Sequence, residues 1–460
     1  MEGDGLAGGS GRLETLRRGL AEAFYRGFRP VMLAAIRVYF RRATLIGRER
    51  FPDRGAALIV ANHPSTWSDV LLLDGLLGRR IHFLSESGQF RPRPRGMLLR
   101  LFGTLPLFSA KTEPRHAERN EETFRRCRAL FDRGEAVAIF PEGISRTDRS
   151  LMPLRPGASM LARSYAMRGD ANPSFSIVLV GLRYSDRTAF RSDVSLKLDD
   201  PIPLSMLRDV YAGPVTEEAD RLTLRMAGAL RSLAGLAEDP RDGWLLSRLE
   251  PIVAVRERGR DRASAEALER AIISLRHDDP DRYRRLRLVA RRHARILRAL
   301  RVSDAALAAR HRAGVASSLR WGAAAALTAV PAFAGAAIHA VPFLSVQAVV
   351  RHVAYAPSEI AFARIASGTF FLLLTYAALG GVFTRFLHAG PALAAGLLAL
   401  CAVLGLFALA FGYHARARVE RARVARIARR HPRLVQWARR GQDALGRWAS
   451  GVADAPGPPS

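Results

Sequence analysis

A histidine and an aspartate that could act together stand six positions apart in this 460-residue sequence. His63 follows the apolar run 56–61, and Asp69 lies at the start of a helical pattern. A carboxylate that accepts a hydrogen bond from one imidazole nitrogen fixes the tautomer and makes the other nitrogen a general base, which accelerates a reaction by roughly 10²–10⁴-fold. An Asn-His pair is also common in ordinary turns, and Ser68 and Asp69 could instead cap the following helix. Taken alone, the pair leaves both interpretations open.

A second polar cluster follows the apolar run 136–140. Its Gly143 permits a positive φ or a close backbone approach. Glu142 could hydrogen-bond an acceptor hydroxyl or organise neighbouring amides, and Arg146 or Arg155 could bind a phosphate. An ordinary turn after a buried strand would have a similar composition.

The elements around these clusters predict an α/β domain. Short apolar runs that predict strands alternate with helical patterns at 68–77 and 119–133. The predicted strands are 56–61, 81–84, 104–107, 136–140, 177–182 and 194–198. Such alternation favours a layered domain with a largely buried central sheet, and ligands bind at the carboxyl ends of strands in such sheets. Both polar clusters follow a predicted strand at that end.

The flanking regions are helical and basic. Residues 13–43 have the apolar spacing of an amphipathic helix, which could lie at a membrane surface or pack on the next domain. We expect N-terminal amphipathic helices at 1–50, a catalytic domain at 51–215, a basic helical region at 216–316, a membrane region at 317–413 and a basic cytoplasmic tail at 414–460.

Three apolar runs in the membrane region have the length of a bilayer span, which needs about 20 residues. Arginines flank the region on both sides, so both flanks should be cytoplasmic, and three spans would violate that arrangement. The first run contains Pro331 and Pro342 and is weakly apolar. We therefore expect a re-entrant segment at about 321–350 and spans at about 365–384 and 390–413.

Composition narrows the classes of partner. The net charge of +29 could attract nucleic-acid phosphate or an anionic membrane. Because the arginines cluster beside apolar runs, the membrane explanation is favoured over a nucleic-acid partner. Two cysteines cannot form a disulfide framework or a thiolate metal cluster. The N-terminus, with Glu2 and Asp4, does not resemble a secretory signal.

Four ordered blocks make residues 38–204 similar to the glycerolipid acyltransferase superfamily. The blocks are Asn62-His63 with Asp69, then Gly103-Thr104-Leu105-Pro106-Leu107, then Phe140-Pro141-Glu142-Gly143, and last Val180-Gly181-Leu182-Arg183-Tyr184 with Phe190-Arg191-Ser192 and Pro201-Ile202. The resemblance implies a layered acyltransferase domain with a central mixed sheet, followed by a helical segment and transmembrane helices. It further implies that His63 is the base and Asp69 its partner. The second and third blocks would bind the acceptor phosphate, and the fourth would serve acyl-donor binding or the fold.

Two departures from the family pattern matter. Five residues separate His63 from Asp69, whereas four is commonest, and the longer spacing resembles the subgroup with fungal-type glycerol-3-phosphate/dihydroxyacetone-phosphate acyltransferases. The stretches 151–158 and 190–192 and the hydrophobic C-terminal part are similar to that subgroup too. Ser109 stands where the second block usually ends in a phosphate-binding Arg, and Lys111 could compensate.

The implied reaction is direct acyl transfer. His63 would take the proton of an acceptor hydroxyl as its oxygen attacks the thioester of acyl-CoA or acyl-acyl-carrier protein. Backbone amides near Gly143 could stabilise the oxyanion. The implied substrate-binding residues are Glu142, Gly143, Arg146, Lys111 and Arg155. No metal, no further cofactor and no covalent acyl-enzyme is expected.

Several alternatives remain open at this point. The acceptor could be glycerol 3-phosphate, dihydroxyacetone phosphate or 1-acylglycerol 3-phosphate. A related enzyme could instead remodel lysophospholipids or acylate another lipid, an aminolipid or a polyol. A catalytically silent scaffold that binds anionic lipid is a rival of a different class. The expected partners are membrane lipids, an acyl donor and a glycerol-phosphate acceptor, with no nucleic acid, at a bacterial inner membrane with the catalytic domain on its cytoplasmic face.

Overall fold

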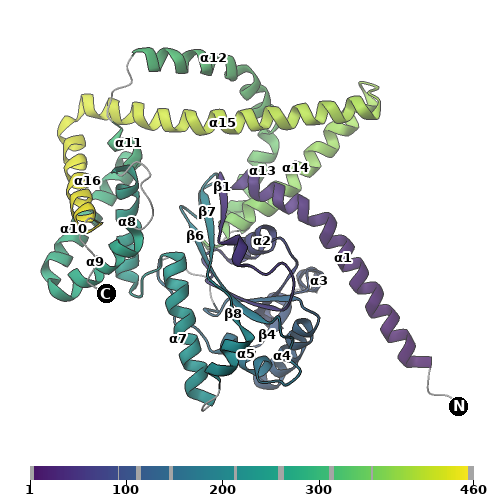
Figure 1. Ribbon diagram of the computed structural model, residues 1–460. Coiled ribbons are helices and arrows are strands. Elements are labelled where there is room, and N and C mark those ends of the chain that lie inside the picture. The colour runs from purple at the N-terminus through teal and green to yellow at the C-terminus, as the bar shows by residue number, and fades with distance from the viewer. Residues whose placement is uncertain are drawn as a thin grey trace. The chain divides into compact units, whose positions relative to one another are not determined.

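The computed structural model describes residues 5–91, 93–109, 115–143, 149–211, 215–256, 264–309, 315–353 and 356–453 (Figure 1). Contacts divide the chain into two compact units. The first takes in the described residues of 1–147, 151–236 and 352–366. The second takes in those of 148–150, 237–351 and 367–460. The first unit thus includes a short segment, 352–366, that is far from the rest of it in the sequence.

Within the described residues, eight strands form one mixed sheet in the first unit (Figure 1). They are β1 (Arg42–Ile46), β2 (Ala57–Ala61), β3 (Ile81–Glu86), β4 (Leu105–Leu107), β5 (Ala136–Ile139), β6 (Ser176–Tyr184), β7 (Asp193–Leu198) and β8 (Ile202–Pro203). Their order is β1-β7-β6-β2-β5-β3-β4, with β8 beside β6. β6 is antiparallel to β7 and β8, and the other pairs are parallel. The predicted α/β class with a central mixed sheet is confirmed.

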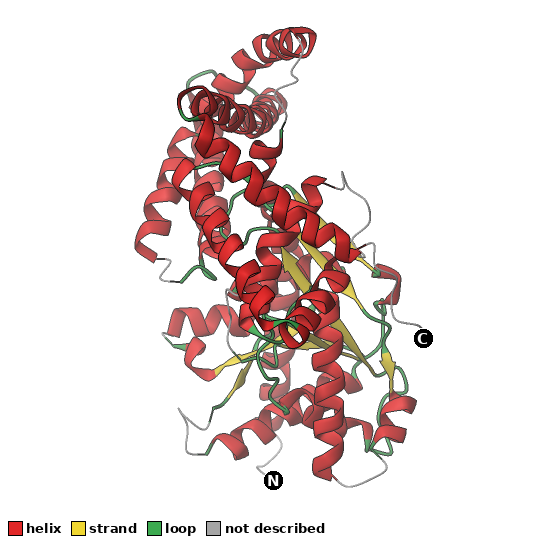
Figure 2. Cartoon of the chain, turned by 90° about the vertical axis from the view of Figure 1, so that its left-hand side faces the viewer, coloured by secondary structure: helices red, strands yellow, loops and turns green. Residues whose placement is uncertain are grey.

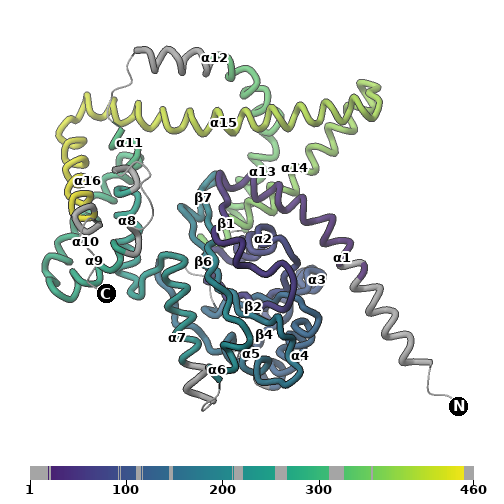
Figure 3. Tube along the Cα trace, in the orientation of Figure 1, coloured from purple at the N-terminus to yellow at the C-terminus, as the bar shows by residue number. Residues whose placement is uncertain are grey.

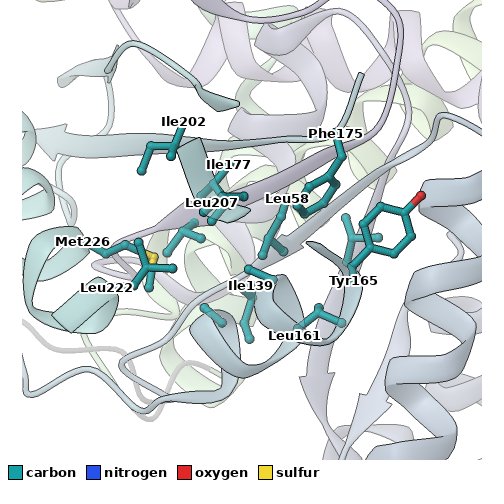
Figure 4. Packing of buried hydrophobic residues seen from close by; sticks show 14 of the residues in the cluster. Leu58, Ile139, Leu161, Tyr165, Phe175, Ile177, Ile202, Leu207, Leu222 and Met226 are labelled. Atoms are coloured by element: carbon teal, nitrogen blue, oxygen red, sulfur yellow. The ribbon is translucent and has the colours of Figure 1, made fainter. Parts of the chain in front are cut away.

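Helices cover both faces of this sheet, as Figure 2 shows. Successive side chains of a strand point to opposite faces, and in β2 Leu58 and Val60 join one buried cluster while Ile59 and Ala61 join the other. The first cluster is completed by α4 (His116–Asp132), α5 (Gly157–Ala166), α6 (Leu204–Val210) and α7 (Val215–Ala234). Figure 4 shows its packing around Leu58, Tyr165 and Phe175. The second cluster is completed by α1 (Gly5–Tyr39), α2 (Thr66–Leu77) and the start of α14 (Ile360–Arg385).

The N-terminal helix ends four residues earlier than its apolar spacing predicts. A helix was expected over 13–43, but α1 ends at Tyr39, and β1 follows it alongside β7. The Arg191 guanidinium donates hydrogen bonds to the carbonyl oxygens of Arg37, Val38 and Phe40 at 3.1–3.3 Å. The last carbonyls of a helix have no partner within it, so this arginine from a distant loop completes the end of α1. Strand pairing then takes over from the helical pattern.

The remaining elements are helices, traced in Figure 3. The first unit adds η1 (Arg48–Arg50), η2 (Ser87–Phe90) and α3 (Arg93–Leu101). The second contains α8 (Pro240–Arg256), α9 (Ser264–Asp278), α10 (Pro280–Leu300), α11 (Asp304–Ala308), α12 (Val315–Ile338), α13 (Ala340–Val353), α15 (Pro391–Arg430) and α16 (Pro432–Ala453). In α10, Tyr283, Leu286 and His293 are buried, so this part of its apolar stripe packs inside the unit.

Among the described residues, two helices are long and apolar enough to cross a membrane. They are α14, which contains the run 365–384, and α15, which contains the run 390–413 except for its first residue. The run 321–350 falls on α12 and α13, which bend by 55° relative to each other around His339. That bend fits a broken span or a re-entrant loop, so the number of spans stays a prediction.

Candidate active site

The sheet order brings three of the sequence blocks to one edge. β2 lies between β5 and β6 and is parallel to both, with Val60 opposite Ile139 and Ala61 opposite Val180. Parallel strands end at the same edge of a sheet. The turn after β2, the turn after β5 and the end of β6 therefore meet there. We call residues 62–69, which follow β2, the catalytic turn.

His63 and Asp69 form a hydrogen-bonded pair in this turn. His63 Nδ1 lies 2.9 Å from Asp69 Oδ2. The Asp69 side chain is fully buried, whereas 15% of the His63 side chain is exposed. A carboxylate accepts only, so Nδ1 carries the proton and Nε2 is left with a lone pair. In the part of the chain that the structure describes, no residue bonds to Nε2. The imidazole is thus arranged to accept a proton from a substrate.

Asp69 is held by two further donors. The Ser65 amide donates to Oδ2 at 2.7 Å, and the Tyr184 hydroxyl donates to Oδ1 at 2.5 Å. Burial, followed by the nearby Asp69 carboxylate, raises the pKa of Tyr184 well above its ordinary value. The phenol therefore keeps its proton and remains a donor. Both carboxylate oxygens are fixed in place.

The His63 ring is also fixed in its plane. It stacks on the Phe140 ring, with 3.9 Å between centroids and 14° between planes. Phe140 directly follows β5, so the neighbouring strand supplies this contact. The ring orientation consequently depends on the pairing of β2 with β5.

Glu142 connects the catalytic turn to the loop after β5. Its Oε1 accepts a hydrogen bond from the His63 amide at 2.9 Å, and its Oε2 accepts one from the Met152 amide at 3.2 Å. Burial raises the pKa of Glu142, while these two amides and His63 oppose the shift. Of the two roles left open by the sequence, Glu142 has the one of organising neighbouring amides.

Gly143 lets a cation approach the same loop. Its φ is 69°, and a Cβ at this position would lie 2.8 Å from Arg155 Cζ. The guanidinium of Arg155 therefore lies directly over the glycine, next to Glu142. The Gly143 amide donates to the Phe140 carbonyl oxygen at 3.1 Å, so it is not available to an oxyanion. The expectation of an oxyanion site thus cannot rest on that amide.

The other predicted phosphate ligands are Arg146 and Lys111, and Ser109 stands where the family pattern has an arginine. Arg146 and Lys111 lie outside the described residues. Ser109 follows β4, which is separated from β5 by β3. Among the described residues, Arg155 is consequently the predicted cation that lies against the loop after β5, which Glu142 joins to the catalytic turn.

Sequence reasoning missed several residues that hold the site. The Asn62 side chain pairs with the Leu182 backbone through Nδ2 to the carbonyl at 3.0 Å and through Oδ1 from the amide at 2.7 Å. Arg187 donates to the Pro64 carbonyl oxygen at 2.8 Å. Tyr184 stands in the fourth block, which was expected to serve acyl-donor binding or the fold, and its hydrogen bond to Asp69 was not foreseen. In each of these contacts the two residues lie more than a hundred positions apart in the sequence, so no local pattern predicts them.

Two residues of the fourth block serve the fold. A Cβ on Gly181 would lie 2.5 Å from the Leu233 carbonyl carbon, so only glycine allows α7 to pack this closely on β6. Arg191 completes the end of α1, as described above. Together with Tyr184, these residues explain the block by packing and positioning.

Comparison with known proteins finds acyltransferases. The family model described as Acyltransferase matches residues 42–182. Glycerol-3-phosphate O-acyltransferase 2 of Saccharomyces cerevisiae is 30% identical over 139 residues, which cover 29% of this chain and 18% of that protein. The 1-acyl-sn-glycerophosphate (LPA) acyltransferase PlsC of Thermotoga maritima, a solved structure, is 16% identical with a TM-score of 0.32, over 48% of this chain and 83% of that chain. The chain therefore spans less than a fifth of the length of its yeast relative.

Proposed function

From the match of residues 42–182 to the Acyltransferase family model, we propose that the chain is a glycerolipid acyltransferase. It transfers a fatty acyl group to a hydroxyl of glycerol 3-phosphate or 1-acylglycerol 3-phosphate. The donor is acyl-CoA or acyl-acyl-carrier protein. The observation that carries the proposal is the His63–Asp69 pair, with its open Nε2 at the carboxyl edge of the sheet. The yeast relative's name supports the smaller acceptor, and the product enters phospholipid synthesis.

The proposed mechanism needs one base and one cation. His63 Nε2 takes the hydroxyl proton as the acceptor oxygen attacks the thioester carbonyl carbon. The carbon–sulfur bond breaks as the ester forms, and the proton passes from His63 to the departing thiolate. Asp69 holds Nδ1 protonated throughout, and it stabilises the imidazolium that forms between the two proton transfers. Arg155 binds the acceptor phosphate beside Gly143.

The decisive experiment removes the base. The full chain in purified membranes is given one radiolabelled acyl donor and a panel of acceptors: glycerol 3-phosphate, dihydroxyacetone phosphate, 1-acylglycerol 3-phosphate and lysophospholipids without a free phosphate. We expect His63→Ala to lower kcat by about 10²–10⁴-fold, while His277→Ala, which changes an exposed histidine of α9, leaves kcat unchanged. Normal transfer by His63→Ala would refute the proposal.

The same panel separates the alternatives. Transfer to lysophospholipids alone would indicate a remodelling enzyme. Binding to anionic liposomes that salt reverses, without turnover on any acceptor, would indicate the scaffold. If Arg155 binds the phosphate, Arg155→Ala raises the KM of phosphorylated acceptors about tenfold or more, and Arg241→Ala, an exposed control in α8, does not.

For the localisation, we propose a membrane protein with the acyltransferase domain on the cytoplasmic face of a bacterial inner membrane. The support is the two candidate spans and the arginine-rich flanks on both sides of the apolar region. Retention of the chain in membranes after alkaline extraction, with the domain open to protease only from the cytoplasmic side, is the expected result.

A further inference from the structure

A segment from far along the chain packs on the catalytic turn. Residues 352–366 belong to the same compact unit as the sheet, and Ser358 is 293 positions from its partner Ser65. We call 358–365, which begins two residues before α14 and includes that helix's start, the docking segment. The docking segment lies outside all four sequence blocks.

Two contacts join the docking segment to the catalytic turn directly. The Ser65 hydroxyl donates to the Ser358 carbonyl oxygen at 3.3 Å, and both serines are buried. The Trp67 and Phe362 rings lie 5.7 Å apart between centroids at an angle of 33°. An aromatic pair at this spacing adds to the stability that burial alone gives.

The docking segment is itself fixed in the core. Ala361 is fully buried and Ile365 is 6% exposed, both within the cluster that contains Leu72 and Leu73 of α2. The Arg364 guanidinium donates to the Thr188 carbonyl oxygen, close in sequence to the end of β6. Within α14, the side chains of Ala361, Phe362 and Ile365 lie on one face at helical spacing. This face therefore packs against α2 and the catalytic turn.

The contacted turn needs such support. Ser65 is held at both ends, because its amide donates to Asp69 Oδ2 while its hydroxyl donates to Ser358. Thr66, between Ser65 and Trp67, has a φ of 38°. A positive φ is strained for a β-branched residue and persists only where the surroundings hold it. Loss of the docking segment would release that strain next to the catalytic carboxylate.

The helix that carries these contacts continues as a candidate membrane span up to Arg385. We propose that the docking segment is a positioning element of the acyltransferase domain, with Phe362 as its principal positioning side chain. One helix thereby provides both the membrane anchor and the support for the His63–Asp69 pair. The catalytic consequence rests on the proposed function, whereas the positioning itself does not.

The test compares Phe362→Ala with Phe370→Ala in the full chain. Phe370 lies on the same helix, is 61% exposed and is two turns further along, so its loss controls for a general effect on α14. Hydrogen exchange of the peptide 57–72 reports on the Ser65 and His63 amides without any assumption about activity. We expect about fivefold faster exchange there in Phe362→Ala, with no change in Phe370→Ala.

Acyl transfer supplies the second readout. We expect kcat of Phe362→Ala to fall about tenfold or more, because small displacements of a catalytic group are costly, while the acceptor KM stays within about twofold. Phe362→Tyr keeps the ring and should restore kcat, and the melting temperature of each variant shows whether the unit as a whole has loosened.

The outcomes are distinguishable. Unchanged exchange in Phe362→Ala, or equal changes in Phe370→Ala, would overturn the positioning role. Faster exchange with a wild-type kcat would overturn the catalytic consequence. If the wild-type chain transfers no acyl group to any acceptor, the proposed function fails, and the exchange experiment still decides whether the docking segment supports the turn.

Discussion

Two histidine–carboxylate pairs lie at opposite edges of the same sheet. His63 and Asp69 follow β2 at the carboxyl edge. At the amino edge, His82 near the start of β3 faces Glu135, which precedes β5, with 2.5 Å between His82 Nε2 and Glu135 Oε2. The His82 Nδ1 is occupied as well, by the Gly103 carbonyl oxygen at 3.0 Å. Both nitrogens of His82 have protein partners, whereas His63 leaves Nε2 for a substrate.

The difference separates a structural histidine from a candidate base. Within the described residues, only one ring nitrogen of His63, Nδ1, has a protein partner, and the Asp69 carboxylate that it contacts is fully buried. Glu135 is 36% exposed at its side chain and is shared with Arg133. A histidine and a carboxylate in contact are therefore insufficient evidence of catalysis. His63 differs from His82 in having, at the carboxyl edge of the sheet, a ring nitrogen without a partner in the described part of the protein.

The largest expected effect comes from neutralising Asp69, and the same change at Glu135 is its control. Asp69→Asn should lower kcat by about 10²-fold or more, because an amide can donate to Nδ1 and so favour the wrong tautomer. Glu135→Gln, the matched change at the other edge, should leave kcat within about twofold. Steady-state transfer by purified membranes measures both. Equal losses in the two variants would end the distinction between the edges.

Changing one glycine to alanine at each edge of the sheet compares the two histidine sites, because each change adds one methyl group. Gly143→Ala places a Cβ 2.8 Å from Arg155 Cζ, and Gly103→Ala places one 2.5 Å from His82 Nδ1, both at positive φ. We expect Gly143→Ala to raise the KM of phosphorylated acceptors up to about tenfold, because the guanidinium must move.

Gly103→Ala should instead cost about 1–3 kcal/mol of unfolding free energy by crowding His82. Thermal unfolding and acceptor titration on the same samples distinguish the two effects. Gly169→Ala is the control, since a Cβ there meets nothing within 4 Å. A KM effect from Gly103→Ala as large as that from Gly143→Ala would contradict the assignment of the phosphate to Arg155.

The smallest expected effect is acid sensitivity at the amino edge. Burial alone would raise the pKa of Glu135, but hydrogen bonds from His82 and Arg133 outweigh it and lower the pKa to about 2 from an ordinary 4.5. The unfolded chain therefore binds this proton at higher pH than the folded chain. The stabilisation is fully present above about pH 4.5 and is lost as the pH falls toward 2.

Because solvent screens Glu135, whose side chain is 36% exposed, the pair should contribute less than about 1 kcal/mol to stability. Glu135→Gln should thus narrow the difference in melting temperature between pH 6 and pH 3 slightly, without changing kcat at neutral pH. An unchanged difference would mean that the ion pair contributes nothing.

The sequence by itself determined the features that short-range patterns record. Short continuous apolar runs predicted β2, β5 and β6, since a strand buried on both faces is apolar over several consecutive residues. The His63–Asp69 pair was visible because both of its members lie within one local stretch. The length of apolar runs identified α14 and α15 as candidate spans.

Only the tertiary structure decided which distant groups complete that turn. Tyr184 reaches Asp69 across 115 positions, Glu142 reaches the His63 amide across 79, and Ser358 reaches Ser65 across 293. These contacts follow from the order of strands in the sheet and from the helix that returns to cover one face. Spacing along the chain carries no record of either, because a hydrogen bond depends on the distance in space between two groups.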